Sequence, residues 1–236
     1  MRKVLLIAAL LALAFTCQAQ YVPTTLAAQQ HGGTGVITIV QHKSTFCLSA
    51  TTCALAFSSS VGAGHFLIYA VAASDAIPTI TTDNNTNSIV NDLTYCSFCG
   101  ERIDYVVSSH SGSTTVTGNV ATSHNLHVHI WEISGLAGSP DKNGTTNQTA
   151  VTALTVSTGT ATTTANELVF GLFFNTTQAN TFTVGSGYGP SETTNDTSGF
   201  DALFTEVKIV STTGVQTATA TAATSSNFDC IVATFK

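Results

Sequence analysis

The chain has 236 residues, a formal net charge of −6 at pH 7, and only 8% charged residues. Its Lys and Arg residues number 7 in all, too few to neutralise a run of phosphates, so nucleic acid is excluded as an expected partner. Solubility must depend on the hydroxyl and amide groups of Thr, Ser and Asn. This composition suits an exported β-protein, because Thr favours half-exposed strands.

Residues 1–19 have the layout of a secretory signal peptide. Arg2 and Lys3 precede an unbroken apolar run, and the small residues that follow it predict cleavage after Ala19. A lipoprotein acylated at Cys17 is the competing interpretation, but the residues just before this cysteine fit the lipoprotein motif poorly. The chain is therefore expected to be secreted or held at the cell surface.

The mature chain is expected to hold one domain. Residues 20–35, which end in "QHGGTG", are predicted to be a flexible leader, whereas residues 36–236 show no shift in composition that would mark a boundary. This length suffices for one sizeable sandwich or barrel. No apolar segment after the signal peptide is long enough for a transmembrane helix.

The rest of the chain alternates short apolar runs with turn residues, which is the pattern of β-strands. No stretch keeps a capped 3.6-residue apolar period, so no long helix is expected. The runs His65–Ala73 and Glu167–Phe174 are apolar on both faces and are predicted to be central strands. Val215–Ala222 is uncharged and is predicted to be a half-exposed or edge strand that favours self-association. In chain order the predicted strands are Gly35–His42, Cys53–Ser58, His65–Ala73, Thr79–Thr82, Ser88–Leu93, Arg102–Ser108, Thr114–Ala121, Leu126–Ile133, Val151–Ser157, Glu167–Phe174, Ala202–Val210, Val215–Ala222 and Phe228–Phe235.

About a dozen strands at this spacing predict an all-β fold, a two-sheet antiparallel β-sandwich that is jelly-roll-like and has no long helix. The order of "LAFSSSVGAGHFLIYAV", "ITTDNNTNS", "WEISGLAGSPDKN", "TTTANELVFGLFF", "GSGYG" and "FDCIVATFK" resembles a broad group of secreted bacterial β-sandwich domains of jelly-roll type. The resemblance runs from roughly Gly35 to the end of the chain. It implies a fold and a location, and it supplies no catalytic residue.

Five of the six cysteines follow the signal peptide. Export favours disulfides, and the short spacings predict the pairs Cys47–Cys53 and Cys96–Cys99. The competing interpretation is a zinc site built from these four thiols, because Cys96-Ser97-Phe98-Cys99 has C-x-x-C spacing. A redox role is less expected, since such a motif normally begins a helix in a βαβ unit. Cys230 is predicted to be a small buried residue of a core strand.

The segment "HNLHVHIWE" is the most unusual stretch of the chain. Alternation along a strand places His127, His129 and Trp131 on one face and Glu132 on the other. This face is a candidate ligand-binding surface, on which the indole and imidazole rings would stack against a sugar. The alternative is an ordinary solvated strand face.

Two further interpretations of this segment involve chemistry. The H-x-H pair would bind a metal if His124, His110 or His65 completed the site, but the cupin pattern fails because no later histidine follows. A buried Glu132 would be a candidate general acid. Glycoside hydrolysis, however, needs two carboxylates across a cleft, and no spaced pair is evident in the sequence.

The loop "TDNNTN" offers oxygen ligands at Asp83, Asn85 and Asn87, which makes calcium the one cofactor to consider. It lacks the Gly and the closing Glu of an EF-hand loop. Asn and Asp are also ordinary turn residues, so a plain hairpin is favoured over a calcium site.

Three functional hypotheses follow. The first is a secreted, non-catalytic sandwich for surface binding or adhesion, with a glycan as its partner. The second is a structural subunit of an extracellular filament or matrix that self-assembles, as the low charge and Thr/Ala strands indicate. The third is a carbohydrate-active or metal-dependent enzyme that uses Glu132 and the histidines; the lack of an acid/base constellation disfavours it.

Overall fold

The computed structural model describes residues 35–98 and 100–236 and builds them from β-strands. The predicted signal peptide and most of the predicted leader lie outside these residues. No helix in the described part is long and apolar enough to cross a membrane. The first six strands are β1 (Thr38–Ala56), β2 (Phe66–Ala73), β3 (Thr79–Asp83), β4 (Val90–Tyr95), β5 (Gly100–Val106) and β6 (Thr115–Ser134). The next six are β7 (Pro140–Ala161), β8 (Glu167–Asn175), β9 (Phe182–Val184), β10 (Ser191–Asn195), β11 (Ala202–Val210) and β12 (Val215–Phe235).

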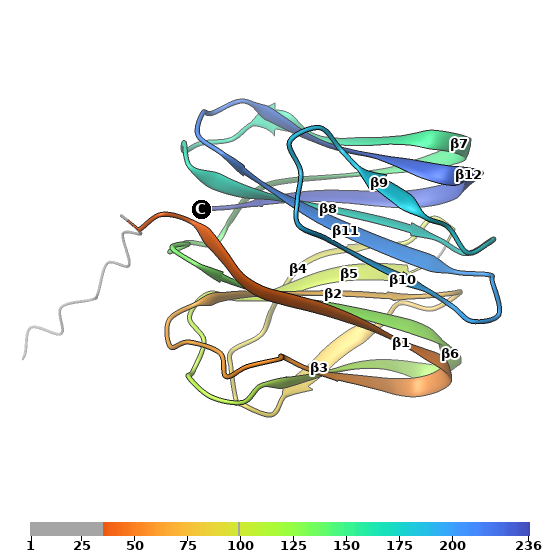
Figure 1. Cartoon of the computed structure of the whole chain (residues 1–236), viewed down its shortest axis with the longest axis horizontal. Coiled ribbons are helices and arrows are strands. Elements are labelled where there is room, and N and C mark those ends of the chain that lie inside the picture. The colour runs from red at the N-terminus through yellow and green to blue at the C-terminus, as the bar shows by residue number, and fades with distance from the viewer. Residues whose placement is uncertain (1–34, 99) are drawn as a thin grey trace, which may run out of the picture. The chain divides into compact units, whose positions relative to one another are not determined.

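The strands form two antiparallel sheets that pack face to face, as Figure 1 shows. The first sheet has the order β1-β6-β2-β5-β4, with β3 also paired to β6. The second has the order β10-β11-β8-β12-β7, with β9 also paired to β12. The predicted all-β sandwich is confirmed, and each sheet is made by one half of the chain.

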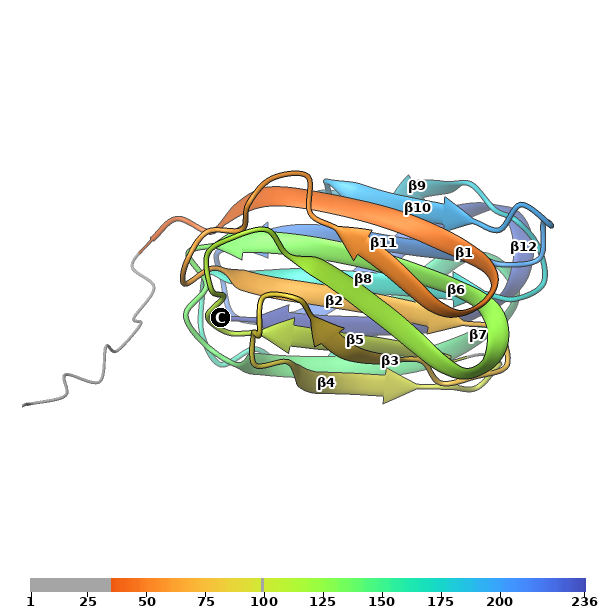
Figure 2. The same ribbon diagram turned by 90° about the horizontal axis from the view of Figure 1, so that it is seen from below.

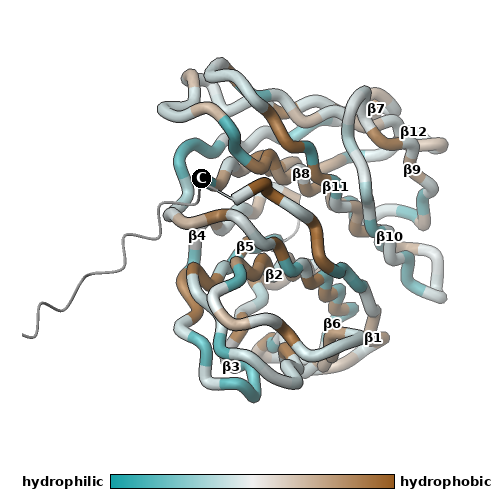
Figure 3. The backbone as a smooth tube through the Cα atoms, turned by 60° about the vertical axis from the view of Figure 1, so that its left-hand side comes forward, coloured by the Kyte–Doolittle hydropathy of each residue, from teal (hydrophilic) through white to brown (hydrophobic). Residues whose placement is uncertain are grey.

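The two central strands, β2 and β8, supply much of the core between the sheets. Every residue of both strands is buried, as the apolar runs predict. Their inner faces meet in one cluster, in which Phe66 packs against Tyr105 and Phe235. Figure 3 shows hydrophobic colour along β2 and β8. Burial of these large side chains is the main force that holds the halves together.

The four longest strands bend, and each therefore serves two layers. Figure 2 shows β1 and β6 side by side along their length and turning together at one end. Their distal parts fold back with β3 over the outer face of the first sheet and bury a second cluster there. The distal parts of β7 and β12 cover the second sheet with a third cluster. A folded ribbon that contributes to two layers is typical of a jelly roll.

The two halves repeat the same topology and register. Phe66 pairs with Ile133 in the first sheet, and Leu168 pairs with Phe235 in the second, so both residue numbers increase by 102. The same increment relates the pairs between β2 and β5 to those between β8 and β11. The sequences "ATSHN" (121–125) and "ATSSN" (223–227) repeat at this interval as well. The fold is thus two copies of one small unit, packed through their inner sheets.

The bend of each long strand is stabilised differently in the two halves. β1 turns at Ser49 and β7 at Ala150, both with positive φ, a conformation that L-residues rarely adopt. The predicted Cys47–Cys53 disulfide is confirmed and closes the bend of β1. In β7, Gln148 replaces the first cysteine in the register and accepts a hydrogen bond across the bend from the Thr155 N–H. A covalent link in one half corresponds to a hydrogen bond in the other.

The strand predictions differ from the structure mainly at the bends. In three places two predicted strands and the loop between them form one continuous strand. The first two predicted strands form β1, the two on either side of "ATSHN" form β6, and the last two form β12. The stretch 140–150, expected as a loop, begins β7. β9 and β10 were not predicted, because β9 has only three residues and β10 is short and polar.

Candidate functional site

His127, His129 and Trp131 do share a face of β6, as alternation predicts, but the second sheet covers that face. All three side chains are fully buried. The Trp131 ring stacks on His42 and meets the edge of Phe170 from the opposite half. The expected accessible face is therefore wrong, since local periodicity says which residues share a face and not what packs on it.

The two buried histidines form a hydrogen-bonded chain with hydroxyl groups of the second sheet. The Thr194 Oγ1 atom lies 2.8 Å from His127 Nδ1 and 2.8 Å from His129 Nε2, and Thr205 Oγ1 lies 2.9 Å from His129 Nδ1. Because one hydroxyl has one proton, Thr194 donates to one imidazole and accepts from the other. Burial lowers the pKa of His127 to about 3, and burial together with His127 lowers that of His129. Both rings are neutral cross-links between the sheets.

A partly exposed polar group lies beside this chain, where β1 faces β10. Glu192 Oε1 is 2.5 Å from His42 Nδ1, and its Oε2 accepts a 2.6 Å hydrogen bond from Ser44 Oγ. The side chains of His42 and Glu192 are 30% and 19% exposed, so solvent reaches them. Sequence reasoning missed this group, because its members come from strands of different halves.

The repeat supplies an internal comparison for the histidine chain. Adding 102 to the numbers of His129 and Trp131 gives Ile231 and Ala233, which occupy the same inner face of the second sheet. The topology thus accepts apolar side chains at these positions. The fold therefore does not require an imidazole at position 129, whereas the counterpart of His127 is Asp229, which is also buried and polar.

Glu132 faces the other side of β6, as predicted, and is fully buried. Its Oε1 accepts a 2.8 Å hydrogen bond from the Gly62 N–H and lies 2.5 Å from His65 Nδ1, while Gln41 Nε2 donates to its Oε2 at 2.5 Å. All of these partners belong to β1 or to the loop before β2. The Glu132 carboxylate anchors that loop. Both of its oxygens already have partners within the protein, which disfavours a role as general acid.

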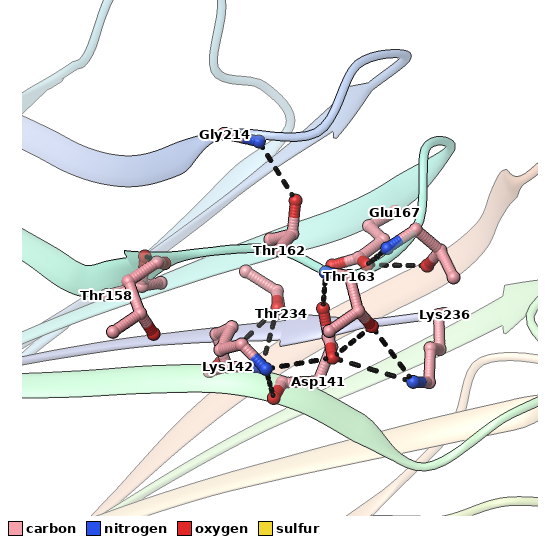
Figure 4. Close-up of polar contacts among 11 residues, drawn as sticks. Asp141, Lys142, Thr158, Thr162, Thr163, Glu167, Gly214, Thr234 and Lys236 are labelled. Carbon is pink, nitrogen blue, oxygen red and sulfur yellow. Dashed lines mark hydrogen bonds and ion pairs between the residues drawn. The ribbon is translucent and has the colours of Figure 1, made fainter.

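The second half has a carboxylate in the corresponding place. Glu167, which is the equivalent of His65, is buried and accepts hydrogen bonds from the Thr164 N–H and hydroxyl (Figure 4). Thr234 stands where Glu132 stands in the first half. In both halves a buried carboxylate thus holds the loop before the central strand, which favours a structural role for Glu132.

The residues of the predicted calcium loop come together, but they hydrogen-bond one another and their neighbours. Asp83 Oδ1 accepts from the Asn85 and Asn87 N–H groups, and its Oδ2 accepts from Tyr69 Oη at 2.9 Å and Asn87 Nδ2 at 2.8 Å. Asn85 Nδ2 donates to the His110 carbonyl. These contacts are those of a capped turn. Within the described ranges no three His, Cys, Asp or Glu residues are grouped so as to hold a metal.

The other two histidines considered as third ligands, His124 and His110, have partners of their own. His124 contacts Thr122, and His110 lies in the turn beside Asn85. The predicted third ligand for an H-x-H metal site is thus not brought near the pair by any of these contacts.

The C-x-x-C turn is bound to the opposite half. Asp229 Oδ2 accepts 2.8 Å hydrogen bonds from the Ser97 and Phe98 N–H groups. Burial, with the nearby Glu101 and Asp229 carboxylates, raises the pKa of Cys96, which is the reverse of an activated redox thiol. Cys99 lies outside the described residues, so the Cys96–Cys99 bond stays a prediction. The four-cysteine zinc site is overturned, because Cys47 and Cys53 are oxidised.

We expect the single tryptophan to report this burial. Trp131 should emit at short wavelength in the native protein, and glycans, Zn²⁺ and Ca²⁺ should leave its emission unchanged, because both ring faces are covered. Fluorescence titration of the mature protein measures this, with guanidinium-unfolded protein as the long-wavelength control. A saturable shift with any glycan would contradict the buried position.

Comparison with known proteins does not assign a function to any of these residues. No protein-family model, curated protein or solved structure matches the chain.

Proposed function

We propose that the mature chain is a non-catalytic extracellular structural protein whose copies associate along the free edge of β7. The observation that carries this proposal is the character of that edge. β7 ends its sheet, and from Asn143 to Ala161 it contains neither a charged residue nor proline. An exposed strand edge of this kind is a template for pairing with another chain.

The other terminal strands provide the contrast. β1, β4 and β10 also end their sheets, and each carries a charged residue: Lys43, Asp92 and Glu192. Charges on an edge strand oppose pairing with a second copy. β7 also has a proline and two charged residues, but they lie at its start, from Pro140 to Lys142. The run from Asn143 to Ala161 is the longest uncharged stretch on these four terminal strands.

The two other functional hypotheses have less support. A glycan site on His127, His129 and Trp131 would require a face that the second sheet covers. An enzyme that uses Glu132 would require a carboxylate that three neighbouring groups already bind.

Sedimentation velocity of the mature protein over a range of concentrations tests the proposal. We expect concentration-dependent oligomers for the wild type and monomers for a Thr149→Lys, Thr152→Lys variant, because both positions are exposed on β7. The matched control is Thr217→Lys, Thr221→Lys, which adds the same charge at exposed positions of β12, a strand paired to β7 and β9. The control should still associate.

A wild type that stays monomeric at every concentration would refute assembly. Oligomers that persist in the β7 variant would refute this edge as the contact, and loss of association in both variants would show a general charge effect.

A further inference from the structure

The start of β7 and the end of β12 bring a lysine and an aspartate together in the second half. Pro140 pairs with Phe235 in the antiparallel ladder, so Asp141 and Lys236 are diagonal neighbours on the same face of the two strands (Figure 4). Lys236 Nζ is 3.5 Å from Asp141 Oδ1. The Asp141 side chain is only 3% exposed, whereas that of Lys236 is 36% exposed. The carboxylate is buried at the point where the amine reaches it.

Hydrogen-bond donors surround the Asp141 carboxylate. The Thr163 N–H donates to its Oδ2, the Thr163 hydroxyl donates to its Oδ1 at 2.6 Å, and Lys142 Nζ lies 3.2 Å from Oδ1. Burial opposes ionisation of Asp141, but these hydrogen bonds outweigh burial and hold its pKa well below the usual value. Such donors also stabilise the negative charge that develops on oxygen when a nucleophile adds to a carboxyl carbon.

A second buried carboxyl group adjoins this pair. Glu167 is fully buried, and its Oε1 is bound by the Thr164 hydroxyl at 2.7 Å. Among the described residues its Oε2 has no hydrogen-bond partner. A side-chain interaction with Glu167 contributes to the pKa of Asp141, so the two carboxyl groups are close neighbours. Glu167 is placed to exchange protons with the reacting groups.

We propose that Lys236 and Asp141 condense to form an intramolecular isopeptide bond. The Lys236 ammonium gives one proton, relayed by Glu167, to an oxygen of Asp141, and the neutral amine adds to Cγ of the protonated carboxyl group. A new Nζ–Cγ bond forms, and the nitrogen gives up a second proton, which Glu167 relays to the same oxygen. That Cγ–Oδ bond then breaks, and the oxygen leaves as water with both protons. The net reaction joins one ammonium and one carboxylate into an amide and one water, without oxidant or cofactor.

The bond would join the first and last strands of the second half across 95 residues of sequence. The first half offers no counterpart, because Ser134 stands 102 residues before Lys236 and has no amine. Instead, the disulfide of β1 is found in the first half. Each half would thus contain one covalent link, which suits a protein that must stay folded outside the cell. This inference does not depend on the assembly proposed for β7.

Intact mass spectrometry of the folded, purified mature protein tests the proposal. We expect a mass lower by one water than the sequence with its disulfides predicts, and a branched peptide that joins Lys236 to Asp141 after proteolysis. Lys236→Arg, which keeps the positive charge, should restore the full mass, as should Glu167→Gln. Lys43→Arg is the matched control and should still lose water, because Lys43 is an exposed residue of β1 in the other half.

The full mass in the wild type, or a water lost at another site, would overturn the bond and leave an ordinary ion pair. Water loss that persists in Glu167→Gln would overturn the role of Glu167, and water loss in Lys236→Arg would overturn that of Lys236. The wild-type mass decides the main point even if a variant fails to fold.

Discussion

Replacement of Trp131 by alanine is expected to lower the free energy of unfolding by about 3 to 5 kcal/mol, the usual range for a large buried aromatic side chain. Trp131 is fully buried between the sheets, where it stacks on His42 and contacts Phe170. Its removal would leave a cavity at the contact between the two halves. Guanidinium unfolding measured by circular dichroism checks this, since the variant has no tryptophan to report.

The control for this variant is Phe200→Ala, at an aromatic side chain that is 60% exposed. It should change the free energy of unfolding by no more than about 0.5 kcal/mol, as surface substitutions usually do. An equal loss in the two variants would contradict the assignment of Trp131 to the core.

The second large effect concerns pH. Burial raises the pKa of Glu206 to about 7 and that of Asp201 to about 6, against ordinary values of 4.5 and 3.8. A carboxyl group whose pKa is raised by folding binds its proton more tightly in the folded state. Stability should therefore increase as the pH falls from 8 toward 5. For Glu206 the gain between pH 8 and pH 5 is on the order of 2 kcal/mol.

Asp141 acts in the opposite direction at lower pH. Its pKa is held below the ordinary 3.8, so its contribution is present above that value and is lost as the pH falls further. Maximum stability should lie near pH 4, because the contributions of Glu206 and Asp201 are complete only near their ordinary values of 4.5 and 3.8, whereas that of Asp141 is lost below 3.8. If the Asp141–Lys236 amide forms, Asp141 no longer titrates and this acid limb disappears.

Urea unfolding at pH 5 and pH 8 measures the effect. Glu206→Gln should be less dependent on pH than the wild type, because the amide has no proton to gain, and Asp201→Asn should reduce the remainder. A wild type that is more stable at pH 8 than at pH 5 would refute the raised pKa of both groups.

The strands themselves were largely predictable from the sequence. β2 and β8 are recognisable because large apolar side chains occupy both alternating sets, which only a strand covered on both faces accommodates. The Cys47–Cys53 disulfide was predictable from its short spacing in a chain with a predicted signal peptide. The face shared by His127, His129 and Trp131 also followed from the two-residue period.

The bent strands were harder to predict. "ATSHN" and "ATSSN" are small, polar and turn-like, so they indicate loops, yet strand pairing resumes beyond them because the partner strand bends at the same point. Their repetition was the one sequence signal of the duplicated unit. Three matching residues before a variable position and one after it are too few to stand out without the repeated register.

By itself, the sequence determined which residues form strands, which of them alternate together, and which strands are buried on both faces. These properties depend on side-chain periodicity within a few residues. The tertiary structure alone decided that a second sheet covers Trp131, that Glu192 meets His42, and that Asp141 meets Lys236. The partners in these three contacts are separated in the sequence by 39, 150 and 95 positions, respectively. Local periodicity carries no information about what lies across a packed interface.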